Sequence, residues 1–407
     1  MLARRSKIFT WTLVKDILTY IFSSSKKKKD YITLFENNCA RYLGVKYITL
    51  TSSGRNGFKL ILEYFNFPQG SEIILSAYTL KDIPLIIKEM GYVPRFVDID
   101  SQTYNIDSSL IEEKINERTV LILVTHMFGL PCKIDKIVEI ARRRNLKIIE
   151  DCAHSLGASY KNKMVGTFGE ASFFSLEIAK PINTFGGGII ATNNQNIYEF
   201  IKKRTAQYYL SRKKIIFKVI FPFLEELITH SPLYFILGFL FYFHSTKKIF
   251  FNIAYKGLRR SLKNIPIRYS NFQAFLGCKA LASFDKKNLI LNEKLKRFRI
   301  FLGKGIVYPF ADYPHSQTIY FNLVRTKYNC LEVRKLLLRR GIDSGVNDEI
   351  SDNCPLYFGD TGNYPILRDV YNSLIQLPFS YEFDDSTLKI VADKLNKVVA
   401  YLQSLNS

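Results

Sequence analysis

The fold of this chain is decided by residues 146–188, which read LKIIEDCAHSLGASYKNKMVGTFGEASFFSLEIAKPINTFGGG. An apolar run at the start of this stretch ends in Glu150 and Asp151, as a buried strand does when it presents acids at its carboxyl end. A second strand-like run, 171–174, precedes Lys180, and three glycines follow at 186–188. Because ligands gather at the carboxyl ends of parallel strands, we expect an acid and a lysine in one ligand site.

This pairing of residues has the layout that a pyridoxal phosphate (PLP) site requires. A lysine can hold the cofactor as a Schiff base, and an aspartate can keep its pyridine nitrogen protonated. Lys180 and Asp151 are therefore our candidate catalytic residues. Asp151 alone has an alternative role as the N-cap of the turn that follows it.

Strand-like runs continue on both sides of this stretch and alternate with helical segments. The expected strands cover residues 47–50, 72–75, 94–97, 120–124, 147–150 and 171–174. The segment 134–144 between two of them has its apolar positions at helical spacing. This alternation predicts an α/β fold with a mostly parallel sheet that helices cover on both faces.

The same pattern divides the chain into domains, for which 407 residues with 47% hydrophobic content are sufficient. We expect a basic amphipathic N-terminal segment over 1–30 and a large domain over 31–301, with a helical region from 271 to 301. A basic hydrophobic insertion at 205–262 interrupts the large domain, and a smaller α+β domain covers 302–407. Within the smaller domain the patterns predict a strand over 318–324 and helices over 331–340 and 386–402.

The formal net charge of +22 is concentrated in two segments that are also rich in apolar residues. Residues 1–30 carry a net +6 and residues 202–263 a net +11. Cationic and apolar side chains together indicate an anionic membrane surface, whereas no motif for nucleic-acid recognition is present. The apolar runs 215–224 and 232–243 are shorter than a membrane-spanning helix requires. In the alternatives, the N-terminal helix packs on the protein's own body, and the insertion covers a subunit interface or the active site.

The cysteines and the chain start indicate the compartment. Six cysteines lie far apart, and none forms a pair or a Cys/His cluster with zinc-ligand spacing, so we expect no metal site. No cleavable signal is recognisable at the start. We expect a reduced, cytoplasmic compartment with peripheral contact at the inner face of the cell membrane.

The remaining requirements of a PLP site also have candidates. Residues 51–57 follow a strand and open a helical segment, so their backbone N–H groups can bind a phosphate. His154 is placed to lie against the cofactor ring, and Ser175 can add a hydroxyl to the phosphate. Taken singly, the turn could be a mere connection and the histidine a structural residue.

Together these motifs resemble the DegT/DnrJ/StrS family of PLP-dependent sugar aminotransferases, which have fold type I. The resemblance covers nearly the whole chain except 1–30 and 205–262. Its strongest block is 150–188, and further motifs match at 125–129, 273–277, 341–342 and 376–378.

The resemblance implies a role for each matching residue. Lys180 would bear the cofactor and carry the proton, Asp151 would pair with the pyridine nitrogen, and His154 would contact the ring. The phosphate would be held by a set of small and polar residues: Gly54, Arg55, Asn56 and Ser175.

Three positions outside the strongest block concern the substrate and the partner subunit of the implied homodimer. Tyr78 and Thr79 are followed by Leu80, where most relatives have an aromatic residue that stacks on the ring. Pro266 stands where the family has an asparagine that reaches the partner's cofactor, while the arginine that follows is kept as Arg268. Tyr78, Leu80 and Arg268 are therefore the weaker candidates for substrate or partner contacts.

The function implied is transfer of an amino group, with glutamate as donor, to a nucleotide- or lipid-linked keto-sugar in cell-surface glycan or glycolipid synthesis. One alternative is another PLP reaction on a sugar, such as that of a deoxysugar dehydratase. The family's dehydratases carry histidine where this chain has Lys180, which favours transamination. The other alternative is a non-catalytic, membrane-associated scaffold, which would not need Lys180, Asp151 and Ser175 together.

Overall fold

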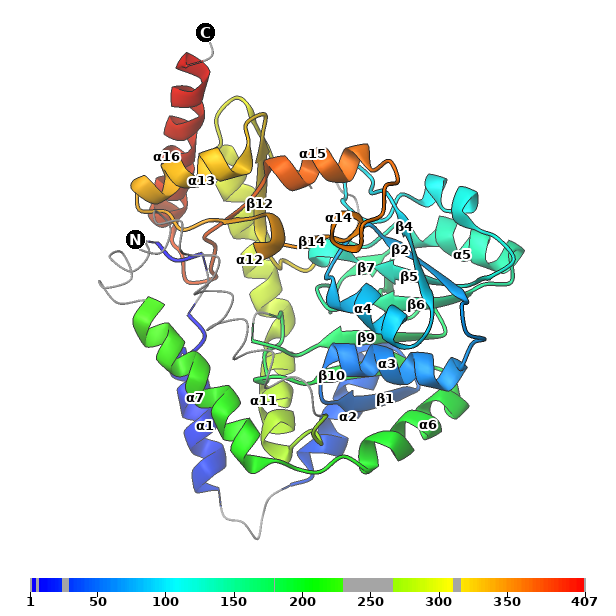
Figure 1. Cartoon of the computed structure of the whole chain (residues 1–407). Helices are drawn as coiled ribbons and strands as arrows, with labels where there is room; N and C mark the ends of the chain where they lie inside the picture. Colours follow the sequence, from blue (N-terminus) through cyan, green and yellow to red (C-terminus); the bar gives the residue numbers. More distant parts are fainter. Residues whose placement is uncertain are drawn as a thin grey trace.

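The computed structural model describes residues 2–4, 7–23, 29–178, 180–229, 266–309 and 316–405 (Figure 1). Its centre is a seven-stranded sheet with the order β1-β10-β9-β6-β5-β2-β4. The strands are β1 (Tyr47–Thr51), β2 (Glu72–Ser76), β4 (Val93–Val97), β5 (Thr119–Thr125), β6 (Lys147–Asp151), β9 (Ala171–Ser175) and β10 (Gly188–Thr192). From β9 to β4 all neighbours are parallel, whereas β10 is antiparallel to β1 and β9. The six expected strands and the mostly parallel α/β sheet are confirmed.

The sheet is apolar on both faces, because successive side chains of a strand point to opposite sides. Ile73 and Leu75 of β2 pack in a core cluster with residues of the helices α3 (Gly54–Phe65), α4 (Asp82–Glu89) and α6 (Gln195–Ala206). Ile74, between them, belongs to a separate cluster with α5 (Ile134–Arg143). Helices therefore cover both faces, and ligand access is left to the edges of the sheet.

Three helices lie on the side of the molecule where β1 forms the edge of the sheet, and a fourth follows α6 in the chain (Figure 1). They are α1 (Trp11–Phe22), α2 (Tyr31–Leu43), α11 (Asn271–Ala282) and α7 (Arg212–Thr229). The expected helical region from 271 to 301 is two helices, because the non-helical backbone of Ser283 separates α11 from α12 (Phe284–Ile300). Of the insertion's two apolar runs, 215–224 lies within α7, and 232–243 lies outside the described residues.

The C-terminal part contains an antiparallel sheet with the order β11-β12-β15-β13. Its strands are β11 (Ile306–Val307), β12 (Asn322–Thr326), β13 (Gly345–Val346) and β15 (Leu374–Leu377), and its helices are α13 (Cys330–Arg339), α14 (Cys354–Phe358), α15 (Pro365–Ser373) and α16 (Asp385–Ser404). Short elements elsewhere are the pairs β3 (Tyr78–Thr79) with β14 (Asp352–Asn353) and β7 (Ser159–Tyr160) with β8 (Lys163–Met164).

The strand expected over 318–324 was wrong at its start, since β12 begins only at Asn322. The backbone before it bonds elsewhere: Thr318 N–H donates to Gly129 O, and Ile319 N–H donates to Asn288 Oδ1. Residues 318–321, which precede β12, therefore lie near the carboxyl edge of the large sheet. The domain boundary near 301 stays a prediction, because Leu367 and Val370 of α15 pack in the core of that sheet.

Among the residues that the structure describes, none of the helices has the length and apolar character needed to cross a bilayer.

Candidate active site

The ends of three neighbouring strands bring the central residues together. Asp151 is the last residue of β6, Thr125 opposite it is the last of β5, and Ser175 is the last of β9. After Ser175 the chain turns, with Lys180 N–H bonded to Glu177 O at 2.9 Å. Lys180 therefore lies in a short turn at the carboxyl edge of the sheet, where the sequence pattern predicts it.

The Lys180 side chain contacts an aromatic residue from the C-terminal part of the chain. Its Nζ donates to the Tyr320 hydroxyl at 3.1 Å and lies 4.7 Å from the centre of that ring. The Tyr320 ring stacks on His154, with 4.1 Å between ring centres and 18° between planes. Lys180, Tyr320 and His154 thus form one contiguous group.

Asp151 is a buried acid with few compensating partners. Burial raises the pKa of its carboxyl to about 6, although the Ala153 N–H, bonded at 3.0 Å, and the nearby charge of Lys180 act in the opposite direction. The bond from Ala153 means that the carboxylate also caps the turn that follows it. A buried carboxylate of this kind is stabilised by a cationic ligand, such as a protonated pyridine.

His154 is held as a neutral imidazole. Burial, with a smaller effect from the Lys180 ammonium, lowers its pKa well below the usual value. Its Nδ1 accepts a hydrogen bond from Phe128 N–H at 3.4 Å, so the proton of the neutral ring is on Nε2. A neutral ring can lie against a cofactor ring without repelling the lysine.

The start of α3 forms a cradle with the end of β9 and the triple glycine. Ser53 caps the helix by accepting from Asn56 N–H at 3.1 Å, and Ser53 also bridges Gly187. A Cβ at Gly188 would lie 2.5 Å from Gly54 N, so these two backbones approach as closely as only glycine permits. The first N–H groups of the helix have no carbonyl partner within it, and such a terminus binds phosphate well.

The two polar side chains after Gly54 are held by neighbours. The Arg55 side chain forms an ion pair with Asp82. Asn56 donates to the Tyr208 hydroxyl at 3.1 Å. Its carbonyl oxygen is buried and has no hydrogen-bond partner among the described residues, and the same holds for the Thr125 hydroxyl. Buried polar atoms without partners mark a place where a polar ligand can bond.

These residues fit PLP. The cradle of Gly54, Arg55, Asn56 and Ser175 offers a helix terminus for the phosphate, Asp151 suits the pyridine nitrogen, and Lys180 lies beside both. The individual contacts to the cofactor stay predictions.

The three weaker candidates lie in different surroundings. Tyr78 is fully buried, with its ring 5.9 Å from that of Phe128, and Leu80 is half exposed. Arg268 is exposed, and its backbone N–H donates to Tyr209 O at 2.9 Å. The burial of Tyr78 favours a role in the core, and the substrate or partner contacts of all three stay predictions.

His126, Glu150 and Cys152 lie within 4.8 Å of one another, as metal ligands could. Two of these groups already have protein partners. His126 Nδ1 accepts from Cys132 N–H at 2.9 Å, so its Nε2 carries the proton and donates to Glu150 at 3.1 Å. Glu150 also accepts from three backbone N–H groups: Gly166, Phe168 and Gly169. We interpret the cluster as a brace that fixes the loop 166–169 and the end of β6.

Replacing Glu150 with glutamine should therefore lower the free energy of unfolding by about 2–4 kcal/mol. The amide would turn an NH₂ group toward backbone N–H donors and leave them unpaired. Urea denaturation of the cofactor-free protein measures the change. Glu170→Gln is the control, because its ion pair with Lys147 is partly exposed and should contribute less than about 1 kcal/mol. Equal effects of the two changes would contradict the brace.

Tyr320 and Tyr208 were missed by the sequence reasoning. Both reach the site from segments far from the 146–188 stretch, and neither belongs to a recognisable motif. The sequence pattern predicts a regular strand over 318–324, and a strand there gives no indication that the Tyr320 ring contacts Lys180.

The sequence model of the DegT/DnrJ/EryC1/StrS aminotransferase family matches residues 14–215. This part of the chain belongs to that family. GDP-perosamine synthase of Escherichia coli O157:H7 is 41% identical over 172 residues, which are 42% of this chain and 47% of that protein. The dTDP-3-amino-3,6-dideoxy-alpha-D-galactopyranose transaminase of Aneurinibacillus thermoaerophilus is 38% identical over 196 residues, 47% of this chain and 53% of that one. The chain thus spans about half the length of these DegT-family relatives.

Solved structures resemble the chain over nearly its full length. PseC of Helicobacter pylori, an aminotransferase involved in the biosynthesis of pseudoaminic acid, has a TM-score of 0.77 at 21% identity and covers 98% of this chain, with 99% of its own chain covered. The aminotransferase TlmJ from Streptoalloteichus hindustanus has a TM-score of 0.76 at 18% identity, with 99% and 100% covered. At such identities the likeness shows the fold alone, and it confirms the expected fold type I.

Proposed function

We propose that this protein is a PLP-dependent aminotransferase that moves an amino group, from glutamate, to a keto-sugar carried on a nucleotide or a lipid. The observation that carries the proposal is the joint placement of Lys180 and Asp151 at the edge where α3 begins. The family of residues 14–215 and the sugar products named in its relatives support it. The product would enter cell-surface glycan or glycolipid synthesis.

In this proposal the protein's own residues bind, orient and move a proton. The start of α3, with Ser175, would hold the phosphate, and His154 would contact the cofactor ring. When bound, PLP supplies an electron sink for the charge left when a proton leaves the carbon next to the transferred nitrogen. Asp151 holds the proton on the pyridine nitrogen, and the amine of Lys180 takes the proton from one carbon and returns it to the next.

The dehydratase is the second candidate, and a half-reaction separates the two. Glutamate alone should convert the absorbance of bound PLP to that of the pyridoxamine form, and a keto-sugar should then leave aminated in step with 2-oxoglutarate. Loss of a sugar hydroxyl without retained nitrogen would overturn transamination in favour of the dehydratase. A protein that binds no PLP after reconstitution would favour the scaffold.

We further propose a homodimer and peripheral contact with an anionic membrane. The resemblance supports the dimer, since the family's partner subunit contributes near the position of Arg268. Light scattering after size exclusion checks it, and a fully active monomer would contradict it.

Tyr320 is proposed as a positioning residue for Lys180. Tyr320→Phe keeps the ring that stacks on His154 but removes the hydroxyl that accepts from Nζ, so kcat should fall about tenfold. Because the loss would fall on proton transfer, the isotope effect with α-deuterated glutamate should rise while the KM for glutamate changes little.

Tyr401→Phe is the matched control, because it removes the hydroxyl of a half-exposed tyrosine on α16. It should leave kcat and the isotope effect unchanged. A Tyr320→Phe variant that loses stability but keeps its isotope effect would mean that the hydroxyl is merely structural.

A further inference from the structure

Helix α1 has two apolar stripes, and the inner one is packed on the protein's own body. Leu13, Ile17 and Tyr20 contact a cluster around the buried Phe275. The ring centre of Tyr20 lies 5.4 Å from that of Phe275 and 5.2 Å from that of Phe272.

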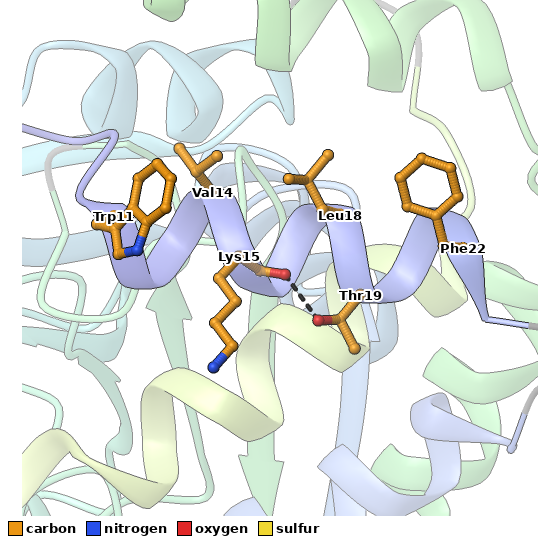
Figure 2. Close-up of a pocket in the computed structure, with 6 residues that line it drawn as sticks. All are labelled: Trp11, Val14, Lys15, Leu18, Thr19 and Phe22. Atoms are coloured by element: carbon orange, nitrogen blue, oxygen red, sulfur yellow. Dashed lines mark hydrogen bonds between the residues drawn. The ribbon is translucent and has the colours of Figure 1, made fainter.

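The outer stripe of α1 consists of Trp11, Leu18 and Phe22, at helical spacing. The exposed fractions are 83% for Trp11, 47% for Leu18 and 81% for Phe22. Figure 2 shows these side chains in one row with Val14, whereas the Lys15 side chain, which lines the same hollow, points its amine away from this row. Within the described parts of the chain, no residue covers this row, which we name the outer stripe.

Helix α7 is bound to the start of α1 and adds to the exposed apolar surface. Glu226 accepts from Ile8 N–H at 2.6 Å, and the rings of Phe9 and Phe223 lie 5.2 Å apart. Ile216 and Ile220 of α7 are more than a third exposed. Direct contacts therefore join α7 to the segment that leads into α1.

The charge around the outer stripe favours one occupant. Lys15 lies beside it, Lys7 is exposed before it, and four consecutive lysines, 26–29, follow the helix in the sequence. Aromatic and aliphatic side chains with a basic flank are typical of a helix that lies in a membrane interface. A second copy pressed on the same face would instead bring like charges together. We propose that the outer stripe of α1 docks on a membrane that contains anionic lipid. This inference rests on the membrane contact proposed above and specifies the residues that make it.

The segment just before the docking helix contacts the loop that follows Lys180. The Phe9 ring lies 5.5 Å from that of Phe185, which is buried and directly precedes the triple glycine. Lys218 of α7 fills the space next to Gly186. Docking on a bilayer would therefore act on a unit that is packed against the active-site loop.

Trp11 is the only tryptophan of the chain, so its fluorescence reports on the outer stripe alone. The PLP-loaded full chain is mixed with vesicles of phosphatidylcholine, with or without phosphatidylserine. With the anionic lipid, the emission should shift to shorter wavelength and be quenched by brominated acyl chains. The protein should sediment with these vesicles, and less of it in about 0.5 M KCl, where charges are screened over a few ångströms.

Two variants keep Trp11 as the probe. Leu18→Ser with Phe22→Ser should weaken vesicle binding at least about tenfold, and Lys15→Glu should weaken it about fivefold or more. Leu289→Ser with Ile300→Ser on α12 is the control, since both are exposed apolar residues far along the chain. This control should bind vesicles as the unchanged protein does.

Unchanged Trp11 emission with anionic vesicles would overturn the proposal. So would a shift that needs no lipid and grows with protein concentration, because a second copy would then cover the stripe. A protein that sediments with anionic vesicles without a shift in Trp11 emission would contradict the outer stripe but not the membrane contact. The assay contains no substrate, so the aminotransferase proposal is tested separately.

Discussion

Replacement of Lys180 with alanine is expected to lower turnover at least about a thousandfold while the protein stays folded. The amine is the proposed attachment point for PLP and the group that moves the proton, so both functions disappear together. Among the residues that the structure describes, the Lys180 amine has one hydrogen bond, which it donates to the Tyr320 hydroxyl at 3.1 Å. The loss of this one bond should change the free energy of unfolding by less than about 1 kcal/mol. Steady-state turnover and urea denaturation measure the two quantities.

A second replacement separates charge from proton transfer at the same position. Lys180→Arg keeps a cation beside Tyr320, but the guanidinium stays protonated and cannot accept a proton, so turnover should be lost as in the alanine variant. Lys147→Ala is the control, because it removes a partly exposed lysine from the opposite end of β6. An arginine variant with substantial turnover would show that another group moves the proton.

Asp151→Asn has the second largest expected effect, and it should act in opposite directions on activity and stability. Without the carboxylate the pyridine nitrogen of PLP is no longer held protonated, so the rate should fall about a hundredfold or more, with weaker cofactor binding. The cofactor-free variant, in contrast, should be more stable than the unchanged protein at pH 7.

The sign of the stability change follows from the raised pKa of this carboxyl, about 6 against an ordinary 3.8. A carboxyl with a higher pKa in the folded state holds its proton more tightly when folded, so unfolding releases it. Stability therefore falls as the pH rises from about 4 to about 6, and the asparagine variant escapes this loss, of roughly 2–3 kcal/mol. Urea denaturation of the cofactor-free proteins at pH 4 and pH 7 measures it. Asp393→Asn on α16, an exposed position, is the control. A variant equally stable relative to the parent at both pH values would contradict a buried, uncompensated Asp151.

The large sheet could be predicted from the sequence because its strands are buried on both faces. Runs such as 72–75 and 120–124 are almost continuously apolar, and polar turns separate them from amphipathic helices. The ends of these strands could also be predicted, because each is marked by the local sequence. Asp151 ends one strand and Lys180 follows another, so both were expected at the same edge of the sheet.

The parts that could not be predicted depend on contacts between distant segments. Tyr320 contacts Lys180 only because the backbone of Thr318 and Ile319 bonds to Gly129 and Asn288 instead of extending β12. The two stripes of α1 likewise read as one amphipathic pattern, and only the position of Phe275 distinguishes the inner one. Local periodicity does not encode such long-range partners.

The most direct test of the central claim is to locate PLP on the chain. The purified protein is reconstituted with PLP and treated with borohydride, which makes the bond between the cofactor and its lysine permanent, and peptides are then mapped by mass spectrometry. The account predicts a yellow protein with the pyridoxyl group on Lys180 alone. A label on another lysine, or no retained cofactor, would contradict it.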